Sequence, residues 1–337
     1  MSAHKQSNYR NFHDPIGLAL RMVKRASLQS IWPLAQAAGT LAAKPLNHIA
    51  SQWEHTKVEG HGSNLQLLVV GLPRSGTTLV SQLLAQHLDV SYFPNISAMF
   101  PDAPIWATQR YLGQFDRPPR SNKSFFGSTV GLGGINDGFH IWNRWLGDNR
   151  YGIDHIPNEE EAIELADFFA CWDATFQKPF LNKNNRNVDG IGLLSQLLPN
   201  SFFVVVQRDL VLNVQSLLTA RKFVQGQDSI GWGLYSDRCD PGSDAIESTC
   251  QQVAIGQHRM KEQLSKLERG RYVEVSYEQL CASPESAVSG IAEFVPCLTM
   301  RSNRRNYPAL KASTTVSLST SDRQRITEFL SGRGLDP

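Results

Sequence analysis

The sequence predicts an α/β fold in which helices flank a parallel sheet and an N-terminal helical extension precedes it. Apolar runs of strand length occupy residues 65–70, 179–181 and 202–206, and an alternating run occupies residues 271–276. Patterns with helical spacing follow the first three runs, and another helical pattern spans residues 284–295. Because parallel strands are joined by helical crossovers, this alternation is typical of a parallel α/β sheet.

The chain divides in this prediction into an extension at residues 1–60 and a main domain at residues 61–337. Asp14 followed by Pro15 is typical of a helix start. A second helix is expected from apolar residues at helical spacing, namely Leu28, Ile31, Trp32 and Ala35. We expect this face to pack on the main domain, and a membrane-surface or dimer role is the less favoured alternative.

Composition restricts the partners of the protein. The 33 Lys and Arg residues nearly balance the 31 Asp and Glu residues, so the net charge is only +2. Such a chain has no overall field that would recruit nucleic acid, and any anion site must be local. The N-terminus lacks the pattern of a signal peptide, and polar residues and Pro33 interrupt the apolar stretch 28–43. We therefore expect a soluble, cytoplasmic protein.

The cysteines give no sign of a metal site or of a disulfide framework. They are scattered without C-x-x-C spacing, at Cys171, Cys239, Cys250, Cys281 and Cys297. A reduced state is expected for them. Cys239 and Cys250 flank a polar loop and form the pair that could join in an oxidising compartment.

The loop Gly71-Leu72-Pro73-Arg74-Ser75-Gly76-Thr77-Thr78 joins the first strand to the first helix of the predicted sheet. Free backbone N–H groups and the helix dipole converge on an anion at such a junction. Arg74 adds a fixed charge, and the hydroxyls of Ser75, Thr77 and Thr78 can donate to phosphate oxygens. Compared with the Walker A pattern GxxxxGK[ST], Thr77 stands at the lysine position and the basic residue lies upstream.

The segment PRSGTT resembles the 5'-phosphosulfate loop of the sulfotransferase superfamily, whose form is P-[KR]-S-G-T-[ST], and the match is complete. The resemblance covers roughly residues 65–295. It implies a P-loop-like sheet and a donor, 3'-phosphoadenosine 5'-phosphosulfate, that requires no metal. It also implies that Arg74, Ser75, Gly76, Thr77 and Thr78 bind the 5' end of this donor.

Arg208 and Ser216 carry a second resemblance to the family. Members bind the 3'-phosphate of the donor with an arginine at a strand end and a serine eight positions later, which is the spacing found here. An arginine can fork onto phosphate oxygens. A third segment, with Tyr277 and Glu278, is similar to the family pattern V-x-Y-E-x-L, which we interpret as structural support.

Catalytic candidates follow from the resemblance only in part. Relatives place a lysine where Lys183 stands, to reach the oxygen that bridges phosphate and sulfate. The histidine that serves as base two residues later in cytosolic relatives is replaced here by Asn185, which cannot accept a proton at neutral pH. Among ionisable residues of the middle segment, we consider His140 and Asp137 as candidate bases, with His140 preferred.

These observations predict a sulfotransferase that transfers a sulfuryl group directly to a hydroxyl or amine acceptor. The aromatic middle segment, residues 89–157, is the expected acceptor pocket. Its tryptophans, including Trp142 and Trp145, suit a small-molecule, carbohydrate or lipid acceptor. One alternative is a phosphoryl-transfer kinase in which Asp209 binds magnesium. Another is a non-catalytic nucleotide-binding relative that has lost its base.

Overall fold

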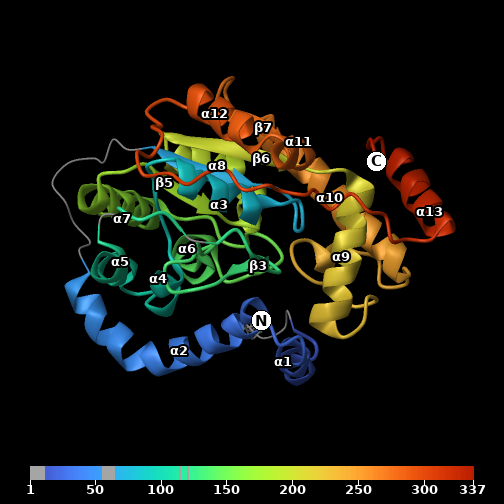
Figure 1. The fold of residues 1–337 in the computed structure, drawn as a ribbon, viewed down its shortest axis with the longest axis horizontal. Helices are drawn as coiled ribbons and strands as arrows, with labels where there is room; N and C mark the ends of the chain where they lie inside the picture. The colour runs from blue at the N-terminus through green and yellow to red at the C-terminus, as the bar shows by residue number, and fades with distance from the viewer. Residues whose placement is uncertain (1–11, 55–64, 114, 120) are drawn as a thin grey trace.

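The computed structural model describes residues 12–54, 65–113, 115–119 and 121–337. Its centre is a parallel sheet in the order β2-β5-β1-β6-β7 (Figure 1). The strands are β1 (Gln66–Val70), β2 (Ser91–Tyr92), β5 (Phe180–Lys183), β6 (Ser201–Gln207) and β7 (Tyr272–Ser276). Every neighbouring pair runs parallel, so the predicted α/β sheet flanked by helices is confirmed.

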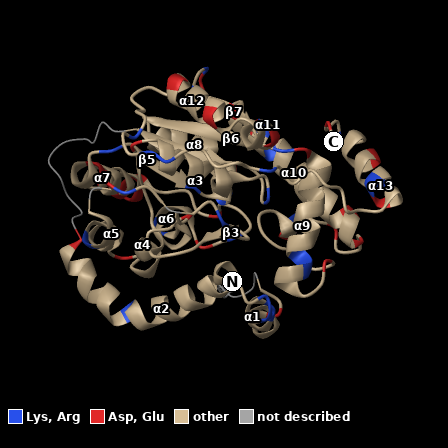
Figure 2. Ribbon diagram, viewed as in Figure 1, with Lys and Arg blue, Asp and Glu red and all other residues tan. Residues whose placement is uncertain are grey.

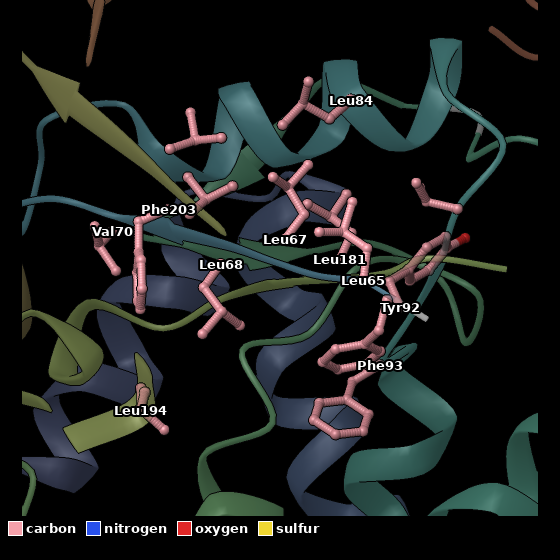
Figure 3. Close-up of a cluster of buried hydrophobic side chains, with 14 of the residues drawn as sticks. Leu65, Leu67, Leu68, Val70, Leu84, Tyr92, Phe93, Leu181, Leu194 and Phe203 are labelled. Atoms are coloured by element: carbon pink, nitrogen blue, oxygen red, sulfur yellow. The ribbon is translucent and has the colours of Figure 1, made fainter. Parts of the chain in front are cut away.

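The centre of the sheet is buried on both faces. All five residues of β1 are buried, and Leu67 and Leu68 point to opposite faces of the strand (Figure 3). Leu84 of α3 (Thr77–His87) lies over one face, and Leu194 of α8 (Ile191–Leu197) lies under the other. This two-sided burial explains why β1 has an uninterrupted apolar sequence, because a strand with one wet face would alternate.

The sheet is covered by two groups of helices. On one face α3 and α12 (Pro284–Phe294) contact each other and the strands. On the other, α8 and the 3-10 helix η2 (Asn185–Gly190) pack against α10 (Ala245–Leu264) and α7 (Glu159–Phe176). The remaining elements of the C-terminal half are α9 (Leu210–Gln225), η3 (Ser236–Arg238), α11 (Tyr277–Ala282) and α13 (Thr320–Ser331).

The start of α7 carries a local sequence signal, whereas the sequence of α10 shows no clear apolar periodicity. Asn158 caps α7, and its side chain accepts a hydrogen bond from the backbone N–H of Glu161. The buried face of α10 instead includes polar side chains such as Gln251 and Gln252, which hides its periodicity from a hydrophobicity pattern.

The N-terminal extension forms α1 (Pro15–Lys24), α2 (Leu28–Ala50) and the short η1 (Ser51–Trp53), which lie along one side of the molecule (Figure 1). The Asp14 side chain caps α1 by accepting from the N–H of Gly17, as its sequence predicts. The expected packing of the α2 face is wrong, because Leu28 is 65% exposed and Ile31 is 42% exposed. The proposed boundary between residues 60 and 61 lies outside the described residues.

The middle segment contains more regular structure than its sequence suggests. It forms β2, α4 (Asn95–Met99), α5 (Pro104–Leu112), the β3–β4 hairpin (Ser124–Phe125 with Ser128–Thr129) and α6 (Phe139–Leu146). Trp142 and Trp145 are completely buried, and the indole N–H of Trp142 donates to Asn182. Both tryptophans therefore belong to the core, so the expectation that their faces stack on an acceptor is wrong.

All five cysteines are free thiols, so Cys239 and Cys250 are not paired. The thiol of Cys239 instead points to the backbone oxygen of Ser248, 3.2 Å away. In the part of the chain that the structure describes, no helix is both long and apolar enough to cross a bilayer.

Candidate functional site

A cavity of about 650 Å³ opens at the carboxyl ends of the central strands. It is bounded by the loop after β1, by Lys183 at the end of β5 and by Arg208 just after β6. The edge of a parallel sheet outside the carboxyl ends of its strands is the usual position of a ligand in such folds. The cavity therefore collects residues that lie more than a hundred positions apart in the sequence.

The loop after β1 presents an uncapped helix end to the cavity. Gly76, with φ of 102°, is the N-cap residue of α3, and no side chain in the described part of the protein caps this helix. Arg74 also has a positive φ, of 71°, a conformation that is strained for a residue with a Cβ. Pro73, Arg74, Gly76, Thr77 and Thr78 line the cavity. The first N–H groups of α3 are thus available to an anion, as the loop sequence predicts.

Ser75 takes a different position from the rest of this loop. It is buried, does not line the cavity, and its hydroxyl has no hydrogen-bond partner among the described residues. A Cβ placed on Gly71 would lie 2.8 Å from this hydroxyl oxygen, so the side chain packs under the loop. Thr77 does line the cavity, and its hydroxyl lies 3.3 Å from the side-chain oxygen of Asn185.

Arg208 contacts Arg74 through a hydrogen bond to its backbone. One guanidinium nitrogen of Arg208 donates to the backbone oxygen of Arg74 at 2.7 Å, and another donates to that of Ser313 at 3.1 Å. The Arg208 guanidinium also lies over the ring of Tyr277, 4.8 Å from its centroid. Burial and the nearby charge of Arg208 lower the pKa of Arg74 to about 10. A bound anion would relieve this repulsion between two cations.

Ser216 lies behind Arg74 and does not line the cavity. Its hydroxyl accepts a hydrogen bond of 3.2 Å from Nε of Arg74, while the Arg74 guanidinium lies over the ring of Phe126. The two residues of the second family resemblance, Arg208 and Ser216, therefore both contact Arg74, but from different sides. In this geometry Ser216 orients the arginine of the loop.

Lys183 is the last residue of β5 rather than a loop residue beyond it, and only 7% of it is exposed. Its side chain lines the cavity and makes no hydrogen bond or ion pair to any residue that the structure describes. Burial lowers the pKa of Lys183, with Asp137 opposing this shift and Arg74 adding to it. A largely buried lysine that lines the cavity and has no ion-pair partner among the described residues suits a site that receives an anion.

Asp137 lines the cavity and His140 does not, although the two residues interact. Burial, with Arg150 and Arg186, lowers the pKa of His140, and Asp137 opposes this shift. Asp137 lines the cavity just before α6, and its carboxylate accepts a hydrogen bond of 3.1 Å from the N–H of Phe139. His140, in the first turn of α6, is exposed and does not line the cavity. Of the two candidate bases, only Asp137 shares the cavity with Lys183.

Several cavity residues have no counterpart in the sequence-based prediction. Phe139 lies between two guanidinium groups, with Arg150 4.0 Å and Arg186 4.6 Å from its ring centroid. Burial lowers the pKa of Arg186 to about 10. Others include Arg25 of the extension and the hairpin residues Phe125, Phe126 and Gly127. Arg144 and Arg150 lie close together in the sequence, but only Arg150 lines the cavity, so the sequence gives little local signal for this set.

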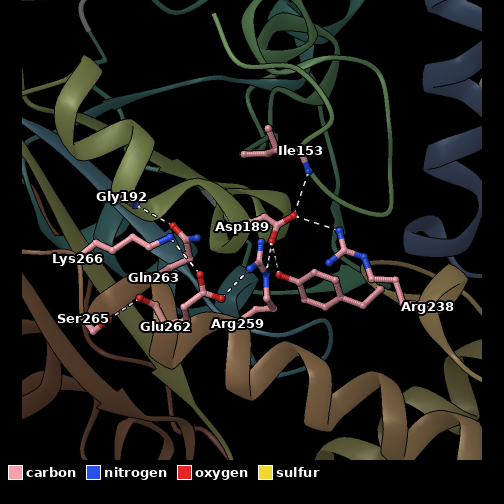
Figure 4. A network of polar contacts seen from close by, with 10 residues as sticks. Ile153, Asp189, Gly192, Arg238, Arg259, Glu262, Gln263, Ser265 and Lys266 are labelled. Atoms are coloured by element: carbon pink, nitrogen blue, oxygen red, sulfur yellow. Dashed lines mark hydrogen bonds and ion pairs between the residues drawn. The ribbon is translucent and has the colours of Figure 1, made fainter.

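A buried carboxylate fixes η2, the element that follows Lys183 and carries Arg186. Asp189 accepts hydrogen bonds from the hydroxyl of Tyr235 at 3.2 Å, from Arg259 at 3.2 Å and from the N–H of Ile153 at 3.3 Å (Figure 4). Arg238 lies 3.5 Å away as a second cation. This network ties η2 to α10 and η3, so it holds one wall of the cavity in place.

Asp209, the residue that a kinase would use for magnesium, has a structural role here. Its carboxylate caps α9 by accepting from the N–H of Leu212 at 2.8 Å, and its side chain is not part of the cavity lining. Among the described residues, no group of three His, Cys, Asp or Glu side chains is arranged to hold a metal ion.

The chain is similar to known proteins of one family. A model of the Sulfotransferase family matches residues 66–297. Similar solved structures include sulfotransferase STF1 from Mycobacterium tuberculosis, at 15% identity and a TM-score of 0.49, with 98% of this chain and 91% of that chain covered. Sulfotransferase STF9 from Mycobacterium avium is 15% identical with a TM-score of 0.48, and the match covers 88% of this chain and 74% of that one.

A sulfotransferase from Alicyclobacillus acidocaldarius is also 15% identical, with a TM-score of 0.42 over 80% of this chain and 93% of that chain. No curated protein matches the sequence. The family match alone spans more than half of the chain and includes the loop after β1, Lys183 and Arg208. This chain therefore belongs to the sulfotransferase family.

Proposed function

We propose that this protein transfers the sulfuryl group of 3'-phosphoadenosine 5'-phosphosulfate to a hydroxyl or amine of a second substrate. The observation that carries the proposal is the convergence of an uncapped helix end, Arg74, Arg208 and Lys183 on one cavity. These groups are cationic or donate hydrogen bonds, and a nucleotide bisphosphate that carries a sulfate is a matching polyanion.

The positions of the cations support a division of labour along the donor. The loop from Arg74 to Thr78 would bind the 5'-phosphosulfate end, and Arg208 would bind the 3'-phosphate. Ser75 and Ser216, which lie behind the cavity lining, would support these contacts rather than make them. Lys183 and the Arg74–Arg208 pair have no carboxylate ion-pair partner among the described residues, so their positive charge favours binding of an anion here.

The donor supplies an activated sulfuryl group, and we propose direct in-line transfer with adenosine 3',5'-bisphosphate as the leaving group. Lys183 would neutralise the charge that develops on the oxygen bridging phosphorus and sulfur as its bond to sulfur breaks. Asp137 would accept the proton that the acceptor loses as its oxygen or nitrogen bonds to sulfur. Support for this pair comes from the shared cavity and from the electrostatic interaction between the two groups.

The aromatic and cationic wall formed by Phe139, Arg150 and Arg186 lies beside Asp137 in the cavity lining and is the proposed acceptor side. This wall replaces the buried tryptophans as the surface that contacts the acceptor. Small-molecule, carbohydrate and lipid acceptors all remain members of the proposed substrate class.

Two measurements test this function. Titration calorimetry should detect binding of adenosine 3',5'-bisphosphate in the presence of a metal chelator, whereas a kinase would require magnesium and ATP. Incubation with donor labelled in its sulfate, together with phenols, sugars and lipid hydroxyls, should label at least one acceptor. Binding without any transfer would identify a non-catalytic relative, and failure to bind the bisphosphate would reject the proposal.

A further inference from the structure

The extension carries most of the exposed apolar surface of the protein. Of the thirteen large apolar side chains that are exposed in the described part of the chain, nine belong to residues 16–53. They are Ile16, Leu20, Val23, Leu28, Ile31, Leu41, Leu46, Ile49 and Trp53, and each is between 42% and 77% exposed. Exposed large apolar side chains are rarely concentrated in one segment of a soluble protein. Such a concentration indicates a surface that binds a partner or a membrane.

The apolar stripe of α2 faces outward along its whole length. Exposed apolar residues recur at spacings of three and four, at Leu28, Ile31, Ala35, Ala38, Ala42, Leu46 and Ile49. The buried positions of the same helix are instead small or polar, namely Ser30, Ala43, Asn47 and Ala50. The helix is therefore amphipathic in the usual sense, but its apolar side faces away from the core of the protein.

Specific polar contacts fix this orientation. Asn47 donates to the carboxylate of Asp102 at 2.5 Å and accepts from the N–H of Asp102 at 3.1 Å. At the other end, the Ser30 hydroxyl donates to the backbone oxygen of Met22 at 2.9 Å. Rolling the helix to bury Leu28 and Ile49 would break these buried contacts, so the outward stripe is a feature of the folded state.

The shorter helix α1 has the same arrangement. Ile16, Leu20 and Val23 form an exposed stripe at spacings of four and three, and Leu18 is the buried residue. Arg21 anchors the helix by donating to the backbone oxygens of Phe223, at 2.7 Å, and Val224, at 3.1 Å. We define the apolar face as the exposed stripes of α1 and α2 together.

The charge of the extension favours an anionic partner. Between Asp14 and Glu54 the extension has four basic residues and no Asp or Glu. Arg21 pairs with Asp14 and Arg25 lines the cavity, which leaves Lys24 and Lys44 as exposed basic residues. Lys44 is the basic residue within α2, which is otherwise tan in Figure 2. Two copies of such a face would repel each other, whereas an anionic lipid surface attracts it and accepts its apolar side chains.

We propose that the apolar face of α1 and α2 binds the surface of a membrane that contains anionic lipids, lying in the interface rather than crossing it. The cavity supports this choice, because Arg25, Ser27 and Gln29 at the junction of α1 and α2 are part of its lining. Docking by this face would bring the cavity to the lipid surface. Where the proposed sulfuryl transfer holds, this position would favour an acceptor that resides in the membrane.

Flotation of the full chain with vesicles tests the proposal without reference to catalysis. The protein should float with phosphatidylcholine vesicles that contain phosphatidylglycerol, and about tenfold more weakly with phosphatidylcholine alone at low salt. The variant Leu20→Gln/Ile31→Gln/Leu46→Gln/Ile49→Gln should lose this binding. These positions are exposed, so the variant should keep the far-ultraviolet circular dichroism and the melting temperature of the parent.

A matched control uses exposed apolar residues outside the extension. The variant Ile156→Gln/Ile163→Gln/Phe294→Gln removes side chains of similar exposure and should float like the parent. Lys24→Gln and Lys44→Gln should each weaken binding to anionic vesicles by about fivefold at low salt.

Either of two results would overturn the proposal. One is a parent protein that does not bind anionic vesicles. The other is a dimer, seen by light scattering, that the quadruple variant converts to a monomer, because the apolar face would then be an interface between two copies. Flotation requires neither donor nor acceptor. A negative result in flotation would therefore not contradict the proposed sulfuryl transfer, which is tested separately.

Discussion

Tyr277 packs directly on Gly76, the residue that begins the helix of the anion-binding loop. A Cβ placed on Gly76 would lie 2.3 Å from Cδ2 of Tyr277, and the φ of this glycine is 102°. The guanidinium of Arg208, the second cation of the site, also lies over the ring of Tyr277. Tyr277, which the sequence suggests only as structural support, therefore connects the two ends of the proposed donor site.

This contact predicts that Gly76→Ala will damage both stability and donor binding. An alanine Cβ at this position would clash with the Tyr277 ring and would strain the backbone. The free energy of unfolding should therefore fall by about 3 kcal/mol. Denaturant unfolding measures this change, and calorimetry measures the loss of bisphosphate binding. Gly270→Ala is the matched control, because Gly270 also has a positive φ, of 83°, but nothing within 4 Å of its Cβ position. Its cost should be only about 1 kcal/mol, and equal losses in the two variants would contradict the steric argument.

Arg208→Ala should weaken the binding of adenosine 3',5'-bisphosphate by about 2 to 3 kcal/mol, the usual value of hydrogen bonds to a charged group. Titration calorimetry gives this number directly. Arg325→Ala serves as the control, since Arg325 forms an exposed ion pair with Asp244 and does not line the cavity. An Arg208 variant with the affinity of the parent would remove this residue from the proposed 3'-phosphate site.

Lys183→Met should stabilise the ligand-free protein while it abolishes most of the activity. Because burial holds the folded-state pKa of Lys183 below its unfolded value, the folded protein binds fewer protons in the range between the two. The penalty is complete below the folded-state pKa and decreases as the pH rises from there toward the unfolded value. Methionine removes this penalty, so the variant should gain about 1 kcal/mol relative to the parent at low pH and less at alkaline pH.

Denaturant unfolding at low and alkaline pH checks the stability of this variant, and steady-state kinetics check kcat. Lys178→Met is the comparison, because Lys178 pairs with Asp89 at 2.6 Å and its loss should cost up to about 1 kcal/mol. A Lys183 variant with the kcat of the parent would exclude the proposed role at the bridging oxygen.

Asp137→Asn should lower kcat by about 100-fold or more if this carboxylate accepts the acceptor proton. The amide keeps the shape of the side chain and can still accept from the N–H of Phe139, so donor affinity should change little. His140→Ala should leave kcat and its pH profile unchanged, since the ring lies outside the cavity. The reverse result, a loss in the His140 variant alone, would restore the histidine as the base.

The local features of this protein follow from the sequence because each depends on neighbouring residues. The apolar run before Gly71 requires a buried strand, the glycines permit the turn, and the stripe from Leu79 onward requires a helix, so the anion-binding loop is readable without the fold. The cap of α1 at Asp14 and the cap of α7 at Asn158 are equally local.

The tertiary structure decided what lies on each side of these elements. Helical spacing reveals the apolar stripe of α2 but not its direction, and the contacts of Asn47 with Asp102, 55 residues away, turn the stripe outward. The sequence favours His140 over Asp137 as the base, yet the start of α6 places Asp137 in the cavity lining and His140 outside it. The periodicity of a sequence identifies the apolar face of a helix. Whether that face packs against the core or lies at the surface depends on contacts between residues that are distant in the sequence.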